Sequence, residues 1–227
     1  MPLPISVAIP VGPDPHYLEW LDECVDSVIA NDPKQIIIID DMQWLGADWI
    51  GTLYKKFPNT MYIRNKWLCG CSTSWNFAVA EASEELVFLC GSDDVMLEGC
   101  LEAIYKSYLE HDSMYGFYSV TIQYDNGELQ DLPCNAAAVC KKLWAEIGGF
   151  EPAAFAAPDG FLLSIMLTYM NNRIIQVDKG TPRYKVRSHL YQDTARQFGR
   201  FFEPAHQLRD IGTRTWKKPE WTAKLGW

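Results

Sequence analysis

Acidic side chains follow two apolar runs of the sequence. Asp40 and Asp41 come after four consecutive isoleucines, and Asp93 and Asp94 come shortly after a second apolar run. Carboxylates gathered without basic partners repel one another, and a divalent cation such as Mg²⁺ or Mn²⁺ relieves this repulsion because it prefers hard oxygen ligands. Such a cation can hold a diphosphate and stabilise it as a leaving group. Each pair taken alone also suits a simple turn or a helix cap.

Two further residues have surroundings that suit chemistry. Asp159 is the one charged residue in the otherwise apolar stretch 153–170, where burial would raise its pKa toward a range useful for accepting a proton. The alternative is that Asp159 caps its helix. His189 lies in a basic neighbourhood that includes Arg187, and its alternative is a surface-strand histidine.

The first half of the chain alternates strand and helix patterns. Unbroken apolar runs indicate strands buried on both faces, and residues at helical spacing indicate the helices between them. This alternation predicts an α/β fold with a parallel, doubly wound sheet. Pro10 predicts that pairing of the first strand ends there. The expected strands are 5–11, 35–40, 61–64 and 85–90, and the expected helices are 17–29, 47–57, 72–82 with an early Ser/Thr cap, and 96–109.

The second half has a different pattern. The turn sequence Asp125-Asn126-Gly127 between two apolar runs predicts a hairpin, so we expect a small antiparallel addition to the mostly parallel sheet. The expected elements are strands 115–124 and 128–132, helices 141–148 and 159–170, strands 173–177 and 183–186, and a tail at 192–227 made of a helix and an extended arm.

The predicted sheet places polar residues at one edge. Ligands of open α/β sheets bind beyond the carboxyl ends of the strands. Pro10 and Val11 follow the first strand, Asp40 and Asp41 the second, and the acidic stretch 91–94 the fourth. Because the two acidic pairs end strands that we expect to lie side by side, their combination favours a cation and diphosphate site more than either pair alone.

Length, charge and composition exclude several classes. The 227 residues, with 48% hydrophobic content, suit one globular domain with a modest appendage. A net charge of −9 disfavours a nucleic-acid binder, which needs a basic face. The seven cysteines show no paired framework and are expected to be reduced thiols. We find no signal peptide and no apolar run near the roughly 20 residues of a membrane span, so we expect no transmembrane segment and a cytoplasmic location.

The order of the early motifs resembles that of family 2 glycosyltransferases with the GT-A fold. The strand ending near Pro10, the helix after it and the isoleucine strand ending in Asp40-Asp41 are similar to the start of that family. The segment 65–80 resembles the family's Asn/Gly-rich lead into a helix. Residues 88–94 resemble its strand ending in Asp-x-Asp.

The second half continues the resemblance. Residues 147–151, with the sequence Ile-Gly-Gly-Phe-Glu, and then Asp159 are similar to the family's Gly-Gly-Phe motif followed by an acidic helix start. The spacing Arg187-x-His189 resembles a late basic motif of the family. The resemblance covers roughly residues 5–190, and the order and spacing of its parts carry it.

The resemblance implies a role for each matching residue. Asp93 would be the metal-binding member of Asp-x-Asp, with Asp94 beside it, and His189 would reach the metal or the diphosphate. Asp159 would be the catalytic base. The implied contacts to the nucleotide diphosphate come from Pro10, Val11, Asp40, Asp41, Asn76, Ser92 and Arg187, where either of the two adjacent aspartates would contact the base or the ribose.

Two positions depart from the family pattern. Gly91 stands in place of the first Asp of Asp-x-Asp, and Pro158 stands in place of the Glu that usually precedes the catalytic Asp. The expected organisation is a GT-A-like catalytic domain at 1–190, with a nucleotide-binding half at 1–112 and an acceptor half at 113–190, followed by a C-terminal helix and arm at 191–227.

The implied function is inverting, metal-assisted transfer of a sugar from a nucleotide-diphosphate donor to a hydroxyl of a saccharide or other acceptor. The alternative that the two departures motivate is a non-catalytic relative that binds sugar nucleotides or glycans. A nucleotidyltransferase is a weaker alternative, because the loop at 12–15 is acidic rather than basic and glycine-rich. No G-x-G-x-x-G follows the first strand, which argues against a dinucleotide oxidoreductase. The aromatic tail favours packing on the domain or in a homodimer over sugar stacking.

Overall fold

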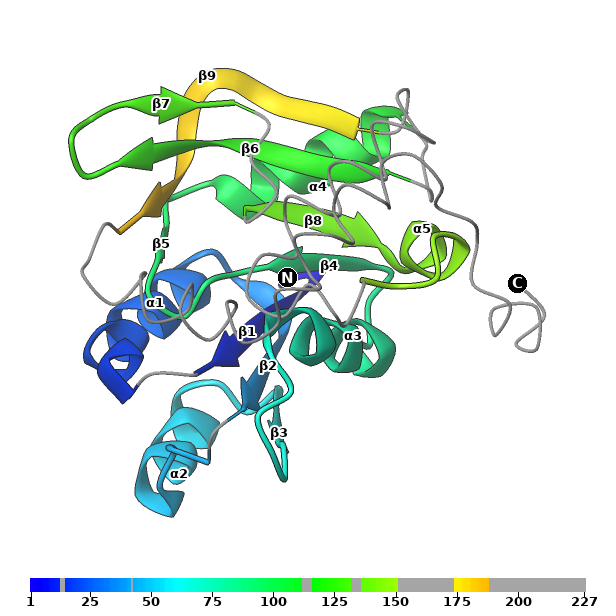
Figure 1. Ribbon diagram of the computed structural model, residues 1–227. Helices are drawn as coiled ribbons and strands as arrows, with labels where there is room; N and C mark the ends of the chain where they lie inside the picture. Colours follow the sequence, from blue (N-terminus) through cyan, green and yellow to red (C-terminus); the bar gives the residue numbers. More distant parts are fainter. Residues whose placement is uncertain (13–14, 42, 112–115, 132–135, 151–173, 188–227) are drawn as a thin grey trace, which may run out of the picture.

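A computed structural model describes residues 1–12, 15–41, 43–111, 116–131, 136–150 and 174–187. Figure 1 shows the described helices and strands arranged around one extended sheet. The predicted helix 159–170, the predicted tail 192–227 and the candidate residues Asp159 and His189 lie outside these ranges.

The first half forms the parallel α/β unit that the sequence predicts. Four parallel strands lie in the order β3-β2-β1-β4, and a helix follows each of the first three. Ile36 to Ile39 of β2 are fully buried, as expected for a strand covered on both faces. The elements are β1 (Leu3–Val11), η1 (Pro15–Tyr17), α1 (Leu18–Ala30), β2 (Pro33–Asp40), α2 (Ala47–Lys56), β3 (Thr60–Arg64), α3 (Cys71–Glu81) and β4 (Leu86–Leu89).

The second half extends the same sheet through strands of mixed direction. Strand β8 pairs antiparallel with β4 and with β6, so it joins the two halves of the sheet. Figure 1 shows β6, β7 and β9 together at the far side of the sheet from β2 and β3. The elements are β5 (Val95–Met96), α4 (Cys100–His111), β6 (Phe117–Tyr124), β7 (Leu129–Gln130), β8 (Ala137–Cys140), α5 (Lys141–Glu146) and β9 (Ile174–Val186).

The structure corrects the predicted elements of the second half. Helix α4 begins at Cys100 rather than at residue 96, because Val95 and Met96 pair with β9. The two strands expected at 173–177 and 183–186 are one strand, β9, whose pairing with β6 contains register shifts. Strand β8 is absent from the prediction, since its alanine-rich sequence has no alternating pattern.

Two details of the first half are also corrected. Strand β1 does not end its pairing at Pro10, because Val11 still pairs with β2 and its carbonyl accepts a hydrogen bond from the Asp41 N–H at 2.9 Å. Helix α3 has no Ser/Thr cap. Its N-cap residue is Gly70, which makes no side-chain capping bond and has a φ of 82°, a value that favours glycine.

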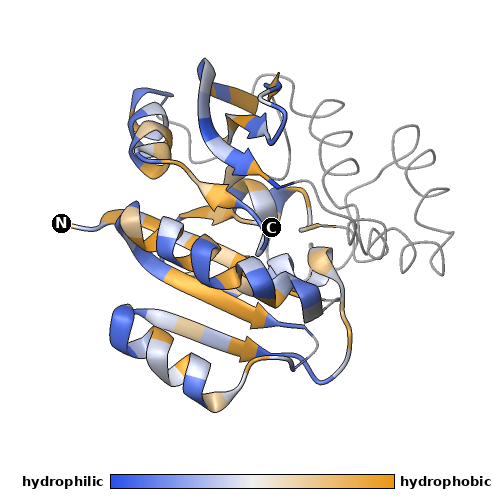
Figure 2. Ribbon diagram, turned by 90° about the vertical axis from the view of Figure 1, so that its left-hand side faces the viewer, coloured by the Kyte–Doolittle hydropathy of each residue, from blue (hydrophilic) through white to orange (hydrophobic). Residues whose placement is uncertain are grey.

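One continuous core includes residues of the parallel strands β1, β2 and β4 and of the antiparallel strands β6 and β8, and partly buried side chains of β3 pack against it. Figure 2 shows these strands coloured mainly as hydrophobic, with helices beside them that carry hydrophilic stretches. The two halves therefore share one core, and the carboxyl ends of β1, β2 and β4 lie at one edge of the sheet. Within the described ranges, every helix is too short or too polar to cross a membrane.

Candidate functional site

The carboxyl end of β4 leads into residues Gly91–Asp94, which we call the acidic turn. The Asp94 N–H donates to the Gly91 carbonyl at 3.4 Å, and Ser92 and Asp94 are buried. A Cβ atom added at Gly91 would lie 2.6 Å from Oδ2 of Asp94 and 3.0 Å from Oδ1 of Asp93. The carboxylates of Asp93 and Asp94 therefore converge on the space beside Gly91.

The end of strand β9 holds the acidic turn. The Arg187 N–H donates to Oδ1 of Asp94, and its Nε donates to the Asp93 carbonyl, both at 3.1 Å. The other end of the guanidinium bonds Glu23 of α1 at 2.6 Å. Tyr184 accepts the first N–H of the turn at 2.8 Å and also bonds the Asp94 side chain. Arg187 therefore lies beside the acidic residues, and Tyr184 is an additional support. The predicted contact of Arg187 with a nucleotide diphosphate stays a prediction.

The electrostatics of the turn follow from its burial. Burial, and next the negative charge of Asp93, raise the pKa of Asp94 well above its ordinary value. The Arg187 N–H and the Tyr184 hydroxyl act in the opposite direction, because they donate to the carboxylate. Burial also raises the pKa of Tyr184, so this hydroxyl stays protonated. A cation placed beside Asp94 would favour the charged carboxylate.

Two buried thiols lie beneath the acidic turn. The sulfurs of Cys24 in α1 and Cys90 are 3.8 Å apart. Cys24 Sγ donates to the Gly91 carbonyl at 3.2 Å, and Cys90 Sγ lies 3.3 Å from the Tyr184 hydroxyl. The hydrogen bond with Cys90, and then burial, raise the pKa of Cys24 well above its ordinary value. These thiols are packing and hydrogen-bonding groups rather than nucleophiles.

Asp40, at the end of β2, is fully buried and bonded within the protein. Its Oδ1 accepts the Trp44 N–H at 2.9 Å. Its Oδ2 accepts the Leu45 N–H at 3.0 Å and the Tyr62 hydroxyl at 2.7 Å. The carboxylate closes the loop after β2, which is the simpler role that the sequence allowed. A contact with the base or ribose of a donor stays a prediction.

Asp41 organises the next loop in the same way. It accepts the Asn65 side-chain amide at 2.7 Å, the Cys69 N–H at 2.9 Å and the Gly70 N–H at 2.7 Å. Asp41 is 4% exposed. The two neighbouring aspartates therefore shape two loops at the carboxyl edge of the sheet, and their side chains point into the protein rather than outward.

Strand β1 separates the two acidic pairs. It lies between β2 and β4, so the expectation that the acidic pairs end neighbouring strands is wrong. Pro10 and Val11 end β1 in that intermediate position, and Val11 is fully buried while Pro10 is half-buried. Since neighbouring strands lie about 4.8 Å apart, the ends of β2 and β4 are about 10 Å apart.

Asn76 of α3 ties the segment after α5 to the first half of the chain. Its Oδ1 accepts the Trp144 indole N–H at 2.9 Å and the Phe150 N–H at 2.8 Å, and its Nδ2 donates to the Phe150 carbonyl at 2.8 Å. Gly149 has a φ of 81°, and an added Cβ there would lie 2.9 Å from the Asn76 amide oxygen. The predicted donor contact of Asn76 stays a prediction, and the role that the geometry shows is to anchor the Gly148-Gly149-Phe150 segment.

The predicted metal ligands are only partly described. Asp93 and Asp94 lie together, and their hard oxygens suit Mg²⁺ or Mn²⁺. The third predicted ligand, His189, and the predicted base, Asp159, fall outside the described ranges. Over the part of the chain that the structure describes, no group of three His, Cys, Asp or Glu side chains is placed to hold a metal ion. The two aspartates therefore fit part of a cation site.

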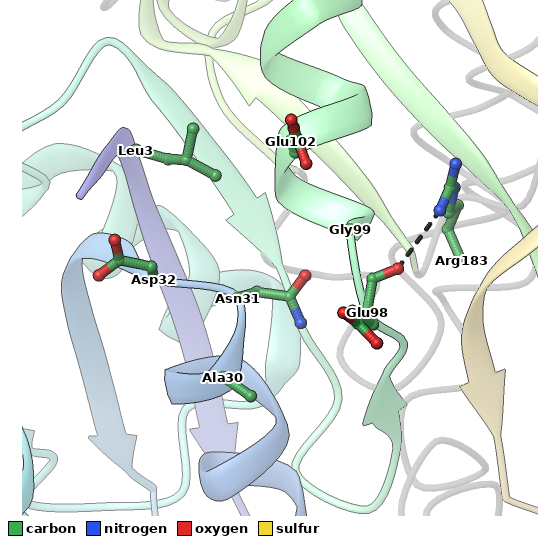
Figure 3. A pocket seen from close by; sticks show the side chains of 8 residues that line it. All are labelled: Leu3, Ala30, Asn31, Asp32, Glu98, Gly99, Glu102 and Arg183. Carbon is green, nitrogen blue, oxygen red and sulfur yellow. Dashed lines mark hydrogen bonds between the residues drawn. The ribbon is translucent and has the colours of Figure 1, made fainter. Parts of the chain in front are cut away.

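A hollow of about 670 Å³ lies elsewhere on the domain. Figure 3 shows that Leu3 and Asp32 line it together with Glu98 and Arg183. Leu3 begins β1, and Asp32 immediately precedes β2, so the hollow lies at the amino edge of the parallel strands. The acidic turn lies at the opposite edge, and this hollow is therefore not the site that the sequence predicts.

Sequence reasoning missed Tyr184 as a support of the acidic turn. The residue is separated from Gly91 by 93 positions, and the pairing of β9 with β5 and β6 brings it close. The turn-forming role of Asp40 and Asp41 was the alternative that the sequence offered, since aspartate is a known turn residue. Tyr184 carries no comparable signal in the sequence.

Several solved structures share this fold. S. aureus TarS residues 1–349 in complex with UDP is 17% identical at a TM-score of 0.69, and the match covers 92% of this chain and 64% of the TarS chain. The same protein in complex with UDP-GlcNAc is 19% identical at a TM-score of 0.66, and the match covers 82% of this chain and 58% of the TarS chain. GalNAc-T7 with UDP, GalNAc and Mn²⁺ is 12% identical at a TM-score of 0.66, and the match covers 83% of this chain and 44% of the GalNAc-T7 chain. The chain thus spans less than two thirds of these relatives, and at such identities the similarity shows the fold alone.

The fold is that of the GT-A class of glycosyltransferases. Residues 6–155 match the family described as Glycosyl transferase family 2. This match covers more than half of the chain, so the chain belongs to glycosyl transferase family 2, as its motifs predicted. A comparison with curated proteins gave no match.

Proposed function

We propose that this family 2 domain transfers a sugar from a nucleotide-diphosphate donor to an acceptor hydroxyl, with inversion at the anomeric carbon and with the help of a divalent cation. The observation that carries the proposal is the acidic turn, which brings the carboxylates of Asp93 and Asp94 together at the carboxyl edge of the sheet. The solved complexes of TarS with UDP and UDP-GlcNAc, and of GalNAc-T7 with UDP and Mn²⁺, support a uridine-diphosphate sugar as the first donor to test.

The proposed reaction is a single displacement. The acceptor oxygen forms a bond to the anomeric carbon while the bond from that carbon to the diphosphate oxygen breaks. The acceptor proton passes to Asp159, the proposed base, on the face opposite the leaving diphosphate. The cation, when bound, supplies positive charge for that leaving group. Asp93 and Asp94, and His189 as the proposed third ligand, would hold it.

The first experiment measures donor binding by thermal unfolding. The chain is heated with UDP, UDP-GlcNAc or UDP-GalNAc, with and without Mn²⁺, and with a GDP-sugar as the control. A ligand at about 100 times its Kd stabilises the folded state by about 2.7 kcal/mol, which corresponds to about 5–10 °C for a chain of this size. A shift that needs both the uridine nucleotide and Mn²⁺ supports the proposal. No shift with any sugar nucleotide would refute it.

The second experiment separates catalysis from binding. The Asp159→Asn variant should keep the donor-induced shift but lose release of free UDP in the presence of acceptor or water. Asp32→Asn is the matched control, since Asp32 is an exposed aspartate at the opposite edge of the sheet. Equal turnover by the Asp159→Asn variant and the wild type would show that the proposed base is wrong.

A non-catalytic protein that binds sugar nucleotides is the second candidate. Gly91 favours it, because the first carboxylate of Asp-x-Asp is missing there. Donor-induced stabilisation of the wild type without any release of UDP, over a panel of acceptors, would support this candidate. A homodimer and a cytoplasmic location remain predictions of the sequence, and a nucleotidyltransferase remains its weaker alternative.

A further inference from the structure

One face of helix α1 contacts the acidic turn and the strands on either side of it. Cys24 Sγ donates to the Gly91 carbonyl at 3.2 Å. One turn of helix further on, the Ser27 hydroxyl accepts an N–H of β5 at 3.0 Å, and Figure 1 shows β5 beside this helix. The Glu23 carboxylate, on the same face, accepts a hydrogen bond from Arg187 at the end of β9 at 2.6 Å. Helix α1 therefore frames the acidic turn, and Glu23 is its link to the arginine.

The guanidinium of Arg187 is held by three different groups. Its Nε donates to the Asp93 carbonyl at 3.1 Å, and its Nη2 donates to Oε2 of Glu23 at 2.6 Å. Its Cζ lies 5.5 Å from the centroid of the Trp20 ring, which is within the range of a cation–π contact. A guanidinium is planar and its donors point in fixed directions, so these three contacts together determine where its positive charge lies.

This positive charge lies close to the two carboxylates that the proposed function assigns to a metal ion. The guanidinium bonds the backbone of Asp93, and the Arg187 N–H bonds Oδ1 of Asp94 at 3.1 Å. Arginine and carboxylate side chains readily pair through two parallel hydrogen bonds. Such a pair would occupy the oxygens that Mg²⁺ or Mn²⁺ needs as ligands. The position of the guanidinium therefore determines how accessible the acidic turn is to a cation.

The ion pair between Glu23 and Arg187 is suited to orienting a charge rather than to stabilising the fold. The Glu23 side chain is 60% exposed and that of Arg187 is 24% exposed. Water screens an ion pair with so exposed a partner, and its contribution to stability is small. The buried contact of Cys24 with Gly91 holds the turn against α1 without it. Removal of the Glu23 carboxylate should therefore leave the protein folded.

We propose that Glu23 is a positioning residue for the acidic turn: it draws the Arg187 guanidinium toward α1 and so keeps both carboxylates of the turn available to a cation. Trp20 supports the guanidinium through its ring face. The inference rests on the proposed function, because it concerns the cation that this function needs. Without Glu23, the guanidinium pairs with a carboxylate of the acidic turn and competes with the metal ion.

The test measures Mn²⁺ binding by electron paramagnetic resonance, with and without UDP. Glu23→Ala should raise the Kd for Mn²⁺ by about 5- to 30-fold, since a charged hydrogen bond from the guanidinium to a carboxylate must break before the ion binds. Glu23→Gln should recover most of the affinity, because its amide oxygen can still accept from Arg187. In the Arg187→Ala background, Glu23→Ala should change the Kd little, because no guanidinium is left to compete.

Glu19→Ala is the matched control, because it removes the same charge from an exposed position one turn earlier on α1. It should bind Mn²⁺ as the wild type does. The melting temperature of Glu23→Ala should fall by at most about 4 °C, as expected for the loss of one exposed ion pair.

Three results would overturn the positioning role while the proposed function stands. They are wild-type Mn²⁺ affinity in Glu23→Ala, equal losses in Glu23→Ala and Glu23→Gln, and an undiminished effect of Glu23→Ala in the Arg187→Ala background. The second result would assign the effect to the lost charge alone. If the wild type binds Mn²⁺ neither alone nor with UDP, the metal-assisted function itself fails, and the positioning role fails with it.

Discussion

Replacement of Gly91 tests how the acidic turn is built. A Cβ atom there would lie 2.6 Å from Oδ2 of Asp94, whereas ordinary contact begins at 3.4 Å, so the carboxylate must retreat by about 0.8 Å. Asp94 has little room for this, because it is 5% exposed and is held by the Arg187 N–H and by Tyr184. We therefore expect Gly91→Ala to destabilise the fold, although alanine is usually the more stabilising residue.

The magnitude follows from the contacts that would be broken. A buried polar group that loses its hydrogen-bond partner lowers the free energy of unfolding by about 1–3 kcal/mol, and Asp94 would lose contact with two partners. Alanine recovers about 0.4–1 kcal/mol through the lower entropy of the unfolded chain. The net loss for Gly91→Ala is therefore about 1–3 kcal/mol, or about 3–10 °C in Tm for a chain of this length. Gly91→Asp, which restores the Asp-x-Asp pattern, should cost more, since it adds a third carboxylate beside Asp93 and Asp94.

The assay is urea unfolding followed by circular dichroism, with Gly51→Ala as the control. Gly51 lies inside helix α2 with no atom within 4 Å of an added Cβ, so its replacement should raise stability by up to about 1 kcal/mol. The Gly91→Asp/Asp94→Ala double variant should show a favourable coupling energy relative to the two single variants, because the crowding carboxylate is then gone. A Gly91→Ala variant as stable as the wild type, or a coupling energy of zero, would refute the reasoning.

Two further predictions concern groups that hold the site. Asp41→Ala leaves the N–H groups of Cys69 and Gly70 without their acceptor, and should lower the free energy of unfolding by about 2–4 kcal/mol in urea, whereas Asp41→Asn should cost less because one amide oxygen can still accept. Equal losses for the two variants would contradict this account. Tyr184→Phe should lower the free energy of unfolding by about 1–3 kcal/mol, since it removes the buried hydroxyl that bonds the acidic turn. Tyr54→Phe, on the exposed face of α2, is the control and should have the same melting temperature as the wild type.

The parallel half of the fold was predictable because its signals are local. The isoleucines of β2 are buried on both faces, which a continuous apolar run expresses directly in the sequence. Strands β5 and β8 were not predictable, since each depends on pairing with a distant segment. The two residues of β5 become a strand only through β9, and the alanine-rich β8 becomes one only between β4 and β6.

The sequence indicates which positions lie at the candidate site, but it does not show the hydrogen-bond partners of their side chains. Strand ends and family motifs mark Asp93, Asp94 and Arg187 in the sequence, and the structure brings them together at the acidic turn, while their roles toward a donor stay predictions. It does not show that Asp40 accepts two backbone N–H groups from its own loop, since loop geometry decides that. Nor does it show the contact of Asn76 with Phe150, which depends on how α3 packs against the segment after α5.

The strand order also determines which of the acidic residues can bind the same cation. Ligands of one Mg²⁺ lie at about 2.1 Å from the ion, so two ligand oxygens are at most about 4 Å apart. The ends of β2 and β4 are about 10 Å apart, because β1 lies between them. Asp40 and Asp41 therefore do not share a cation with Asp93 and Asp94. Their carboxylates satisfy backbone N–H groups instead, and of the two described acidic pairs the acidic turn is the one left to provide aspartate oxygens for the proposed diphosphate cation.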